Sequence, residues 1–150
     1  MKELKLLKVA RSYLRQAEAR LKDAKEAFLE SNYAYAVRLS QECVELSLKA
    51  VLKAVGIEYP KIHDVSDILV EVENRFPNWF RTEIEFLRES SKVLVKKREI
   101  SLYGGEEAFL TPDEVISEND AKDATTRAEK TYGLCEKLIT EIQERKENLT

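Results

Sequence analysis

The chain has 150 residues, of which 43% are hydrophobic and 35% are charged, and its formal net charge is −3. This length fits one domain, residues 1–150, that buries roughly two-thirds of its unfolded surface. The apolar content excludes wholesale disorder, and the small net charge provides no overall field toward DNA or an anionic membrane. Because Lys, Arg and Glu are abundant, we expect a thermophilic source.

A first helix is predicted by apolar residues that recur every three or four positions. Large and small side chains alternate along this stripe, which lets a second helix approach closely. The stripe consists of Leu7, Ala10, Leu14, Ala17, Leu21, Ala24 and Phe28. Ser31 and Asn32 interrupt the pattern, with Asn32 suited to the left-handed conformation that ends helices. A link this short places the next helix antiparallel to the first.

The second predicted helix, residues 33–55, is apolar on nearly every side, which is typical of the central helix of a bundle. One polar stripe remains, and its spacings of four, three, four and four keep it on one face. The stripe consists of Arg38, Glu42, Glu45, Lys49 and Lys53. It is either the exposed face of the helix or a site in a cleft or dimer interface.

Three further helices complete the prediction. Gly56 ends the second helix, and a short third helix follows with Asp64 as its N-cap. A fourth helix comes after Pro77, and a fifth begins near Asn119. Between these two, residues 99–118 lose the helical periodicity, which predicts a loop of about twenty residues. No strand pattern is visible, so the predicted fold is all-α, an antiparallel bundle of about five helices.

His63 is the only histidine, and it precedes the predicted third helix beside Asp64. It is either a general base or ligand oriented by a carboxylate, or a structural residue bonded to nearby backbone. Neither a nucleophile signature nor a cluster of metal ligands accompanies it. We therefore expect no metal, no cofactor and no catalytic triad.

Cys43 and Cys135 both fall on apolar helical faces, which predicts buried free thiols in a reducing compartment. The N-terminal leucines are separated by lysines too often for a signal peptide, and no apolar run reaches the length of a membrane helix. We expect a cytoplasmic protein without a membrane partner.

Taken in chain order, several segments resemble the HEPN domain, an all-helical family named for proposed nucleotide binding. They are residues 32–36 (Asn-Tyr-Ala-Tyr-Ala), residues 41–50 (Gln-Glu-Cys-Val-Glu-Leu-Ser-Leu-Lys-Ala), His63 with Ile68-Leu69, Tyr103, and residues 120–128. The resemblance covers nearly the whole chain and implies a four-helix up-and-down core, usually dimeric. It also implies a partner, a small nucleotidyltransferase encoded beside it, as in some toxin–antitoxin pairs.

The polar stripe, His63 and this resemblance together indicate a nucleotide-binding site. Its candidate residues are Arg38, Glu45, Lys49, His63 and Tyr103. Lys49 is the expected phosphate partner, because its ammonium is a point charge on a flexible stem. Leu102 and Gly104 replace the arginine and proline of the family's Arg-Tyr-Pro segment, so we expect weak nucleotide binding.

Some branches of the family cleave RNA through an arginine followed four to six residues later by a histidine. His63 has no arginine at that upstream distance, and no histidine follows Arg98. We therefore expect a non-catalytic, nucleotide-binding or regulatory protein with no catalytic residues. The alternative is a metal-independent ribonuclease that uses His63 with a spatially close arginine such as Arg38.

Overall fold

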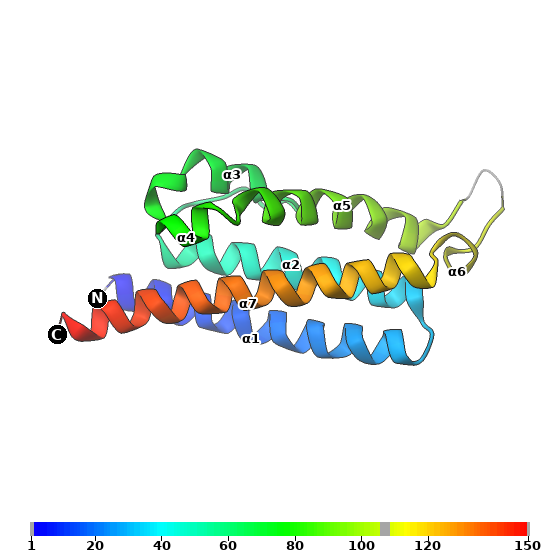
Figure 1. The fold of residues 1–150 in the computed structure, drawn as a ribbon, viewed down its shortest axis with the longest axis horizontal. Helices are drawn as coiled ribbons and strands as arrows, with labels where there is room; N and C mark the ends of the chain where they lie inside the picture. Colours follow the sequence, from blue (N-terminus) through cyan, green and yellow to red (C-terminus); the bar gives the residue numbers. More distant parts are fainter. Residues whose placement is uncertain (1, 106–108, 150) are drawn as a thin grey trace.

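Four long antiparallel helices form the bundle in the computed structural model, which describes residues 2–105 and 109–149. These helices are α1 (Lys2–Leu29), α2 (Tyr33–Ala54), α5 (Ile84–Tyr103) and α7 (Glu118–Asn148). The shorter elements are α3 (Ser66–Glu71), the 3-10 helix η1 (Glu73–Arg75), α4 (Asn78–Arg81) and α6 (Pro112–Val115). The long helices alternate in direction, and both chain ends lie at the same end of the bundle (Figure 1).

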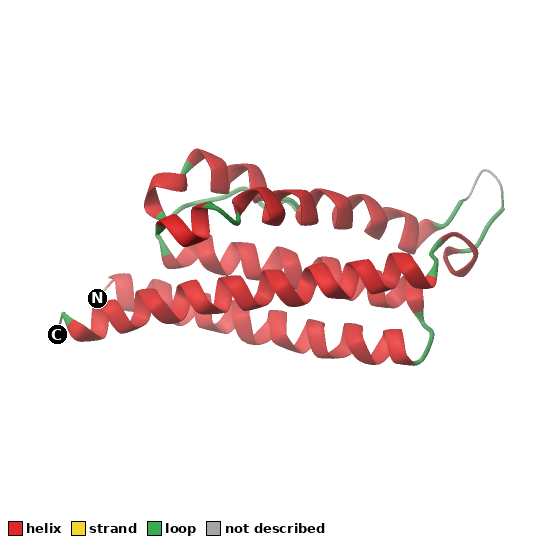
Figure 2. Ribbon diagram, in the orientation of Figure 1, coloured by secondary structure: helices red, strands yellow, loops and turns green. Residues whose placement is uncertain are grey.

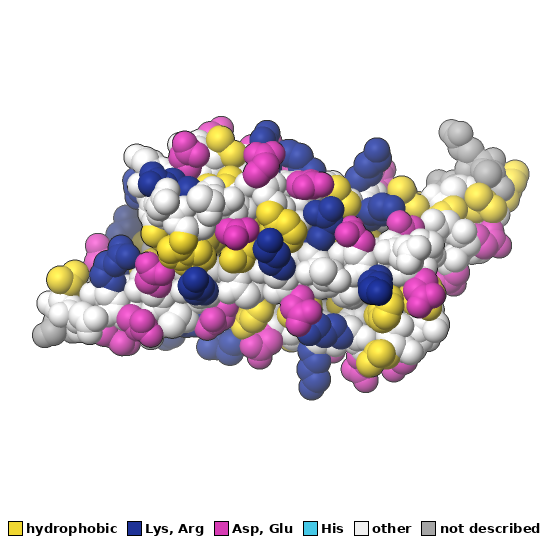
Figure 3. Space-filling model, in the orientation of Figure 1, with side chains coloured by type: hydrophobic (Ala, Val, Ile, Leu, Met, Phe, Trp, Pro, Cys, Tyr) yellow, Lys and Arg dark blue, Asp and Glu magenta, His cyan; other side chains and the backbone are white. Residues whose placement is uncertain are grey.

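The described residues contain no strand, only one isolated bridge between Gly105 and Leu110 (Figure 2). The prediction of an all-α helical bundle is therefore confirmed. In the same part of the chain, no helix combines the length and apolarity needed to cross a bilayer. Figure 3 shows basic and acidic side chains interspersed over one face of the molecule, without a large region of a single sign.

Helix α2 is the central helix, as predicted, and it packs against α1, α5 and α7. Fourteen of its 22 residues are buried, so only a narrow face remains for polar side chains. The predicted stripe on α1 is buried from Leu7 to Ala24, and Phe28 is partly buried against the same core. Alternation of leucine and alanine lets α1 lie close to α2 along its whole length.

Cys43 and Cys135 are both buried and free, as predicted. Burial raises the pKa of the Cys43 thiol to about 12 because the charged thiolate is poorly solvated there. Burial also raises the pKa of the Cys135 thiol. Both side chains therefore behave as small apolar core residues on α2 and α7.

The turn between α1 and α2 corrects one detail of the sequence reasoning. Ser31, rather than Asn32, adopts the left-handed conformation, with a φ of 62°. The amide of Asn32 donates to the carbonyl of Ala27, which closes the end of α1. Gly56 also has a positive φ and follows the last turn of α2, where the sequence placed the end of that helix.

Two predicted boundaries are wrong. The predicted fourth helix is divided into α4 and α5, and residues 99–118 do not form one long loop. Helix α5 continues to Tyr103, and α6 begins at a capping box formed by Thr111 and Glu114. A second capping box, at Ser117, starts α7. In each capping box, reciprocal side-chain hydrogen bonds satisfy backbone amides at the start of the helix. Hydrophobic periodicity does not indicate such helix starts.

Replacing Leu48 with Ala tests the central position of α2. Leu48 is fully buried, so the substitution removes contacts and leaves a cavity. We expect the free energy of unfolding to fall by about 2–5 kcal/mol, measured by chemical denaturation. The matched control is Leu4→Ala, because Leu4 is exposed on α1. That change should stay within about 0.5 kcal/mol of the parent, and equal losses for both variants would contradict the assignment.

Candidate functional site

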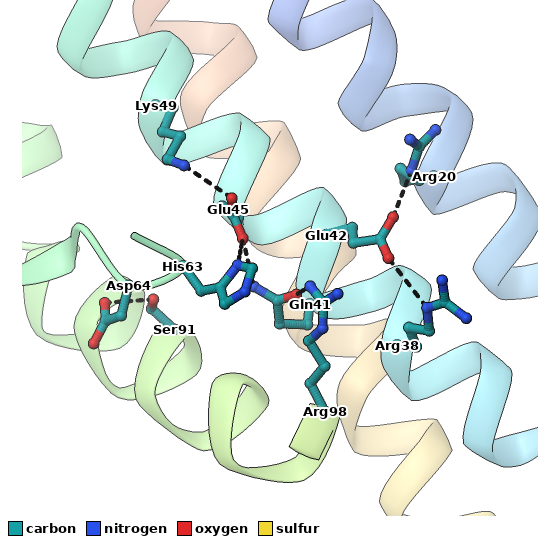
Figure 4. Close-up of polar contacts among 10 residues, drawn as sticks. All are labelled: Arg20, Arg38, Gln41, Glu42, Glu45, Lys49, His63, Asp64, Ser91 and Arg98. Atoms are coloured by element: carbon teal, nitrogen blue, oxygen red, sulfur yellow. Dashed lines mark hydrogen bonds and ion pairs between the residues drawn. The ribbon is translucent and has the colours of Figure 1, made fainter. Parts of the chain in front are cut away.

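The segment that joins α2 to α3, residues 57–65 and here called the strap, is tied to α5 by Asp64 (Figure 4). Asp64 Oδ1 accepts hydrogen bonds from Ser66 N at 2.9 Å and from Ser91 Oγ at 2.6 Å. Lys92 Nζ donates to Asp64 Oδ2 at 3.1 Å. The N-cap of α3 is Val65 rather than Asp64, but Asp64 still satisfies the first amide of that helix.

The carboxylate of Glu45, on α2, is the centre of the site. It accepts three hydrogen bonds: from Gln41 Nε2 at 3.0 Å, from Lys49 Nζ at 2.9 Å and from His63 Nδ1 at 2.8 Å. Glu45 and Lys49 are only 17% and 15% exposed, whereas His63 is 58% exposed. The strap therefore covers this part of the polar stripe and leaves His63 at the surface.

A fifth residue reaches the site from α5. Gln41 is almost completely buried, and its Oε1 accepts a hydrogen bond from Arg98 Nη1 at 2.7 Å. The Gln41 amide thus donates to Glu45 with its nitrogen and accepts from Arg98 with its oxygen, which fixes its orientation. We call Gln41, Glu45, Lys49, His63 and Arg98 the Glu45 cluster.

The ionisation of Glu45 follows from two opposing effects. Burial raises the pKa of its carboxyl, but hydrogen bonds from Gln41, Lys49 and His63 stabilise the anion. The balance leaves the pKa of Glu45 below its ordinary value, so the group is ionised at neutral pH. A carboxylate only accepts hydrogen bonds, so neutral His63 carries its proton on Nδ1.

That tautomer determines what His63 presents to solvent. Its Nε2 keeps a free lone pair and has no hydrogen-bond partner within the described part of the chain. A histidine oriented by a carboxylate in this way accepts a proton at Nε2 or, once protonated, donates one to an anion. The structure gives His63 a side-chain partner on another element, the carboxylate of Glu45, where the sequence also allowed a structural residue bonded to nearby backbone.

Arg38 belongs to a neighbouring ion pair rather than to the Glu45 cluster. Its Nε lies 3.4 Å from Glu42, which also accepts from Arg20 Nε of α1 at 2.8 Å. Figure 4 shows these two arginines on the side of α2 away from His63. The structure therefore pairs Arg38 with Glu42 and brings Arg98, instead of Arg38, into one hydrogen-bonded chain with His63.

Tyr103 is the last residue of α5 and is 59% exposed. Within the described ranges its side chain is not part of the hydrogen bonds that join the other candidate residues. Of the five candidates, the structure thus brings together Glu45, Lys49 and His63, and it leaves Arg38 and Tyr103 outside the Glu45 cluster.

Sequence reasoning did not include Gln41 and Arg98 among the site residues. Gln41 precedes Glu45 by four positions, and this spacing on a helix is a usable signal for a shared face. Arg98 gave no such signal, because it is 57 residues from Gln41 and reaches it only through the packing of α5 on α2.

The Glu45 cluster has the chemistry of an anion site. Lys49 and Arg98 carry two positive charges against the single negative charge of Glu45, and His63 adds a third charge when protonated. Among the described residues, the guanidinium of Arg98 bonds only to Gln41, through Nη1, so its other donors can reach a ligand oxygen. Lys49 is largely covered and contributes mainly by offsetting the charge of Glu45.

Comparison with known proteins agrees with this architecture. The family model of the HEPN domain matches residues 10–138. The crystal structure of TT1696 from Thermus thermophilus superimposes with a TM-score of 0.69 and 24% identity, covering 85% of this chain and 96% of that one. That of ST0689, an archaeal HEPN homologue, has a TM-score of 0.67 and 26% identity, covering 87% and 97%. The search of curated proteins gives no significant match.

Glu45→Gln tests the electrostatic balance of the cluster. The lowered pKa of Glu45 means that its ionised form stabilises the fold above pH about 4.5, the ordinary value, and that this contribution is lost as the pH falls through the folded-state pKa. We expect the variant to unfold more easily by about 1–3 kcal/mol at neutral pH, with the difference shrinking in acid.

Denaturation curves of Glu45→Gln and its parent, measured between neutral and acidic pH, check this expectation. Glu85→Gln is the control, because Glu85 is 85% exposed on α5 and should cost little at any pH. A cost for Glu45→Gln that does not depend on pH would contradict the stated role of its charge.

Proposed function

The chain belongs to the HEPN domain family, and we propose that it acts there as a non-catalytic, regulatory protein that binds a nucleotide. The observation that supports this function is the convergence of Lys49, His63 and Arg98 around one carboxylate. Two of these groups, Arg98 and protonated His63, keep donors free for phosphate oxygens. The ligand's phosphates bind at this point, in charge-assisted hydrogen bonds.

The proposed ligand enters without rebuilding the fold. His63 and Arg98 are already held by Glu45 and by Gln41, so a phosphate meets donors whose positions are set in advance. This preorganisation reduces the ordering cost of binding. The covered position of Lys49 and the single net charge of the cluster keep the affinity moderate.

A regulatory protein acts on another protein, so the proposal also includes protein partners. We propose a homodimer and a small nucleotidyltransferase partner, as in a toxin–antitoxin pair. Large apolar side chains exposed at the helix ends and near α6 support a protein contact; they include Leu29, Tyr103, Phe109 and Leu110. Light scattering of the isolated chain should give twice the monomer mass at micromolar concentration. A monomer mass would remove the homodimer from the proposal.

A metal-independent ribonuclease is the second candidate, and one observation favours it. Glu45 orients His63 so that Nε2 is free, and the same hydrogen-bonded chain holds Arg98. In that function, His63 Nε2 takes the proton of the attacking 2′-hydroxyl, and Arg98 stabilises the negative charge on the phosphate in the transition state.

Calorimetry with ATP tests the leading proposal. We expect weak binding to the parent protein, and Arg98→Ala and Lys49→Ala should each reduce the affinity by about tenfold or more, roughly 1.4 kcal/mol. The Arg98→Ala substitution removes direct contacts to the phosphate, whereas Lys49→Ala leaves the negative charge of Glu45 without its neighbouring cation. The control is Lys96→Ala, because Lys96 is exposed on α5 two residues before Arg98 and outside the cluster.

Two results would contradict this expectation. Absence of binding heat with any common nucleotide removes the nucleotide ligand, and equal losses in Lys96→Ala and Arg98→Ala remove the specific site. The same proteins incubated with RNA separate the second candidate: cleavage by the parent that His63→Ala abolishes and Lys96→Ala retains makes the protein a ribonuclease.

A further inference from the structure

A hollow lies next to the Glu45 cluster, between the start of α2 and the end of α5. Its volume is about 300 Å³, the lower end of the range for small-molecule sites. The residues of its lining that matter here are Asn32, Tyr35, Arg38, Ser101, Leu102 and Asp113. We propose that the nucleoside part of the ligand occupies this hollow while its phosphates lie at the cluster, an inference that rests on the proposed function.

The position of the hollow is set by two antiparallel helices. On α2, Arg38 precedes Gln41 by three residues, and on α5, Ser101 follows Arg98 by three residues. Three residues of helix rise about 4.5 Å along the axis, so on both helices the hollow lies within one turn of a cluster residue, Gln41 or Arg98, on the side of α2 that carries Arg38. Ser101 Oγ donates to the carbonyl of Arg98 at 2.7 Å, so its hydroxyl is held against the backbone of α5 beside the cluster.

Charge separates the two places into a phosphate end and a nucleoside end. The hollow holds one cation, Arg38, and one carboxylate, Asp113, so it has no net attraction for a polyphosphate. An uncharged nucleoside suits it better, because a carboxylate accepts hydrogen bonds from ribose hydroxyls and base amino groups. The cluster, with Lys49 and Arg98 against Glu45, retains the positive excess.

Tyr35 supplies the surface on which a base stacks. It is half exposed at the rim, and an aromatic ring binds every base through its π-face. Asn32 stands beside it, and its side chain makes no capping bond to α2, so its amide remains for a base edge. On the other side of Tyr35, a second hollow is lined by the carboxylates of Asp23, Glu26 and Glu30, which repel phosphate and leave one direction for the ligand.

The test compares ATP with inorganic tripolyphosphate, which has the phosphates without a nucleoside. By calorimetry, Tyr35→Ala should weaken ATP binding by about tenfold and leave tripolyphosphate binding unchanged, because stacking contributes only to the nucleoside end. Arg98→Ala should weaken both ligands. The control is Val70→Ala, because Val70 is an apolar residue of α3 about as exposed as Tyr35, and it does not line the hollow.

The possible outcomes separate a failure of the nucleoside placement from a failure of the proposed nucleotide binding. Two outcomes overturn the placement of the nucleoside while the phosphate site stands, provided that tripolyphosphate binds. In one, Tyr35→Ala lowers the affinities for tripolyphosphate and ATP equally. In the other, it lowers neither affinity. If the parent binds neither ligand, the proposed nucleotide binding fails, and the placement fails with it. Circular dichroism of Tyr35→Ala identical to the parent shows that a loss of affinity is not a loss of fold.

Discussion

The arrangement of the site depends on one partly buried anion, the carboxylate of Glu45 on the central helix. An ionised group this poorly exposed is tolerated only when hydrogen bonds replace its lost water. Gln41 and Lys49 supply two of those bonds from α2 itself, and His63 supplies the third from the strap. The contact with Glu45 therefore holds the exposed ring of His63 in place on the strap.

The same need extends to α5 through Gln41. A buried carboxamide must satisfy both its donors and its acceptor, and Gln41 does so by joining the anion of Glu45 to the cation of Arg98. Removing either partner would leave a buried polar group without a bond, which costs more than the bond itself contributes. A shifted register of α5 on α2 would leave these buried polar groups unpaired, and that penalty is larger than the stabilisation that the bonds themselves provide. Hydrophobic packing alone would tolerate small shifts, so the network is what fixes the register.

The long helices and their buried faces were predictable from the sequence, because they follow from the periodicity of apolar residues. The stripe on α1 and the buried character of α2 are local patterns, and both are confirmed because every helical turn repeats the same signal. Periodicity did not predict α6 or the division of α4 from α5, since elements of four residues carry too few turns to show a period. The contact of Gln41 with Arg98 is a product of helix packing, and no local pattern encodes which of several basic residues on α5 arrives there.

Two consecutive residues of the strap bind different helices: His63 contacts α2 and Asp64 contacts α5. In the proposed function, a phosphate oxygen that accepts a hydrogen bond from His63 Nε2 requires a proton on that atom, and a ring with protons on both nitrogens binds the carboxylate of Glu45 more strongly than the neutral ring does. By linkage, a stronger contact between His63 and Glu45 stabilises the present position of the strap. The same position includes the contacts of Asp64 with α5. In the proposed function, occupancy of the Glu45 cluster would therefore be coupled to the position of the strap, and a protein partner bound to the strap would sense the ligand without touching it.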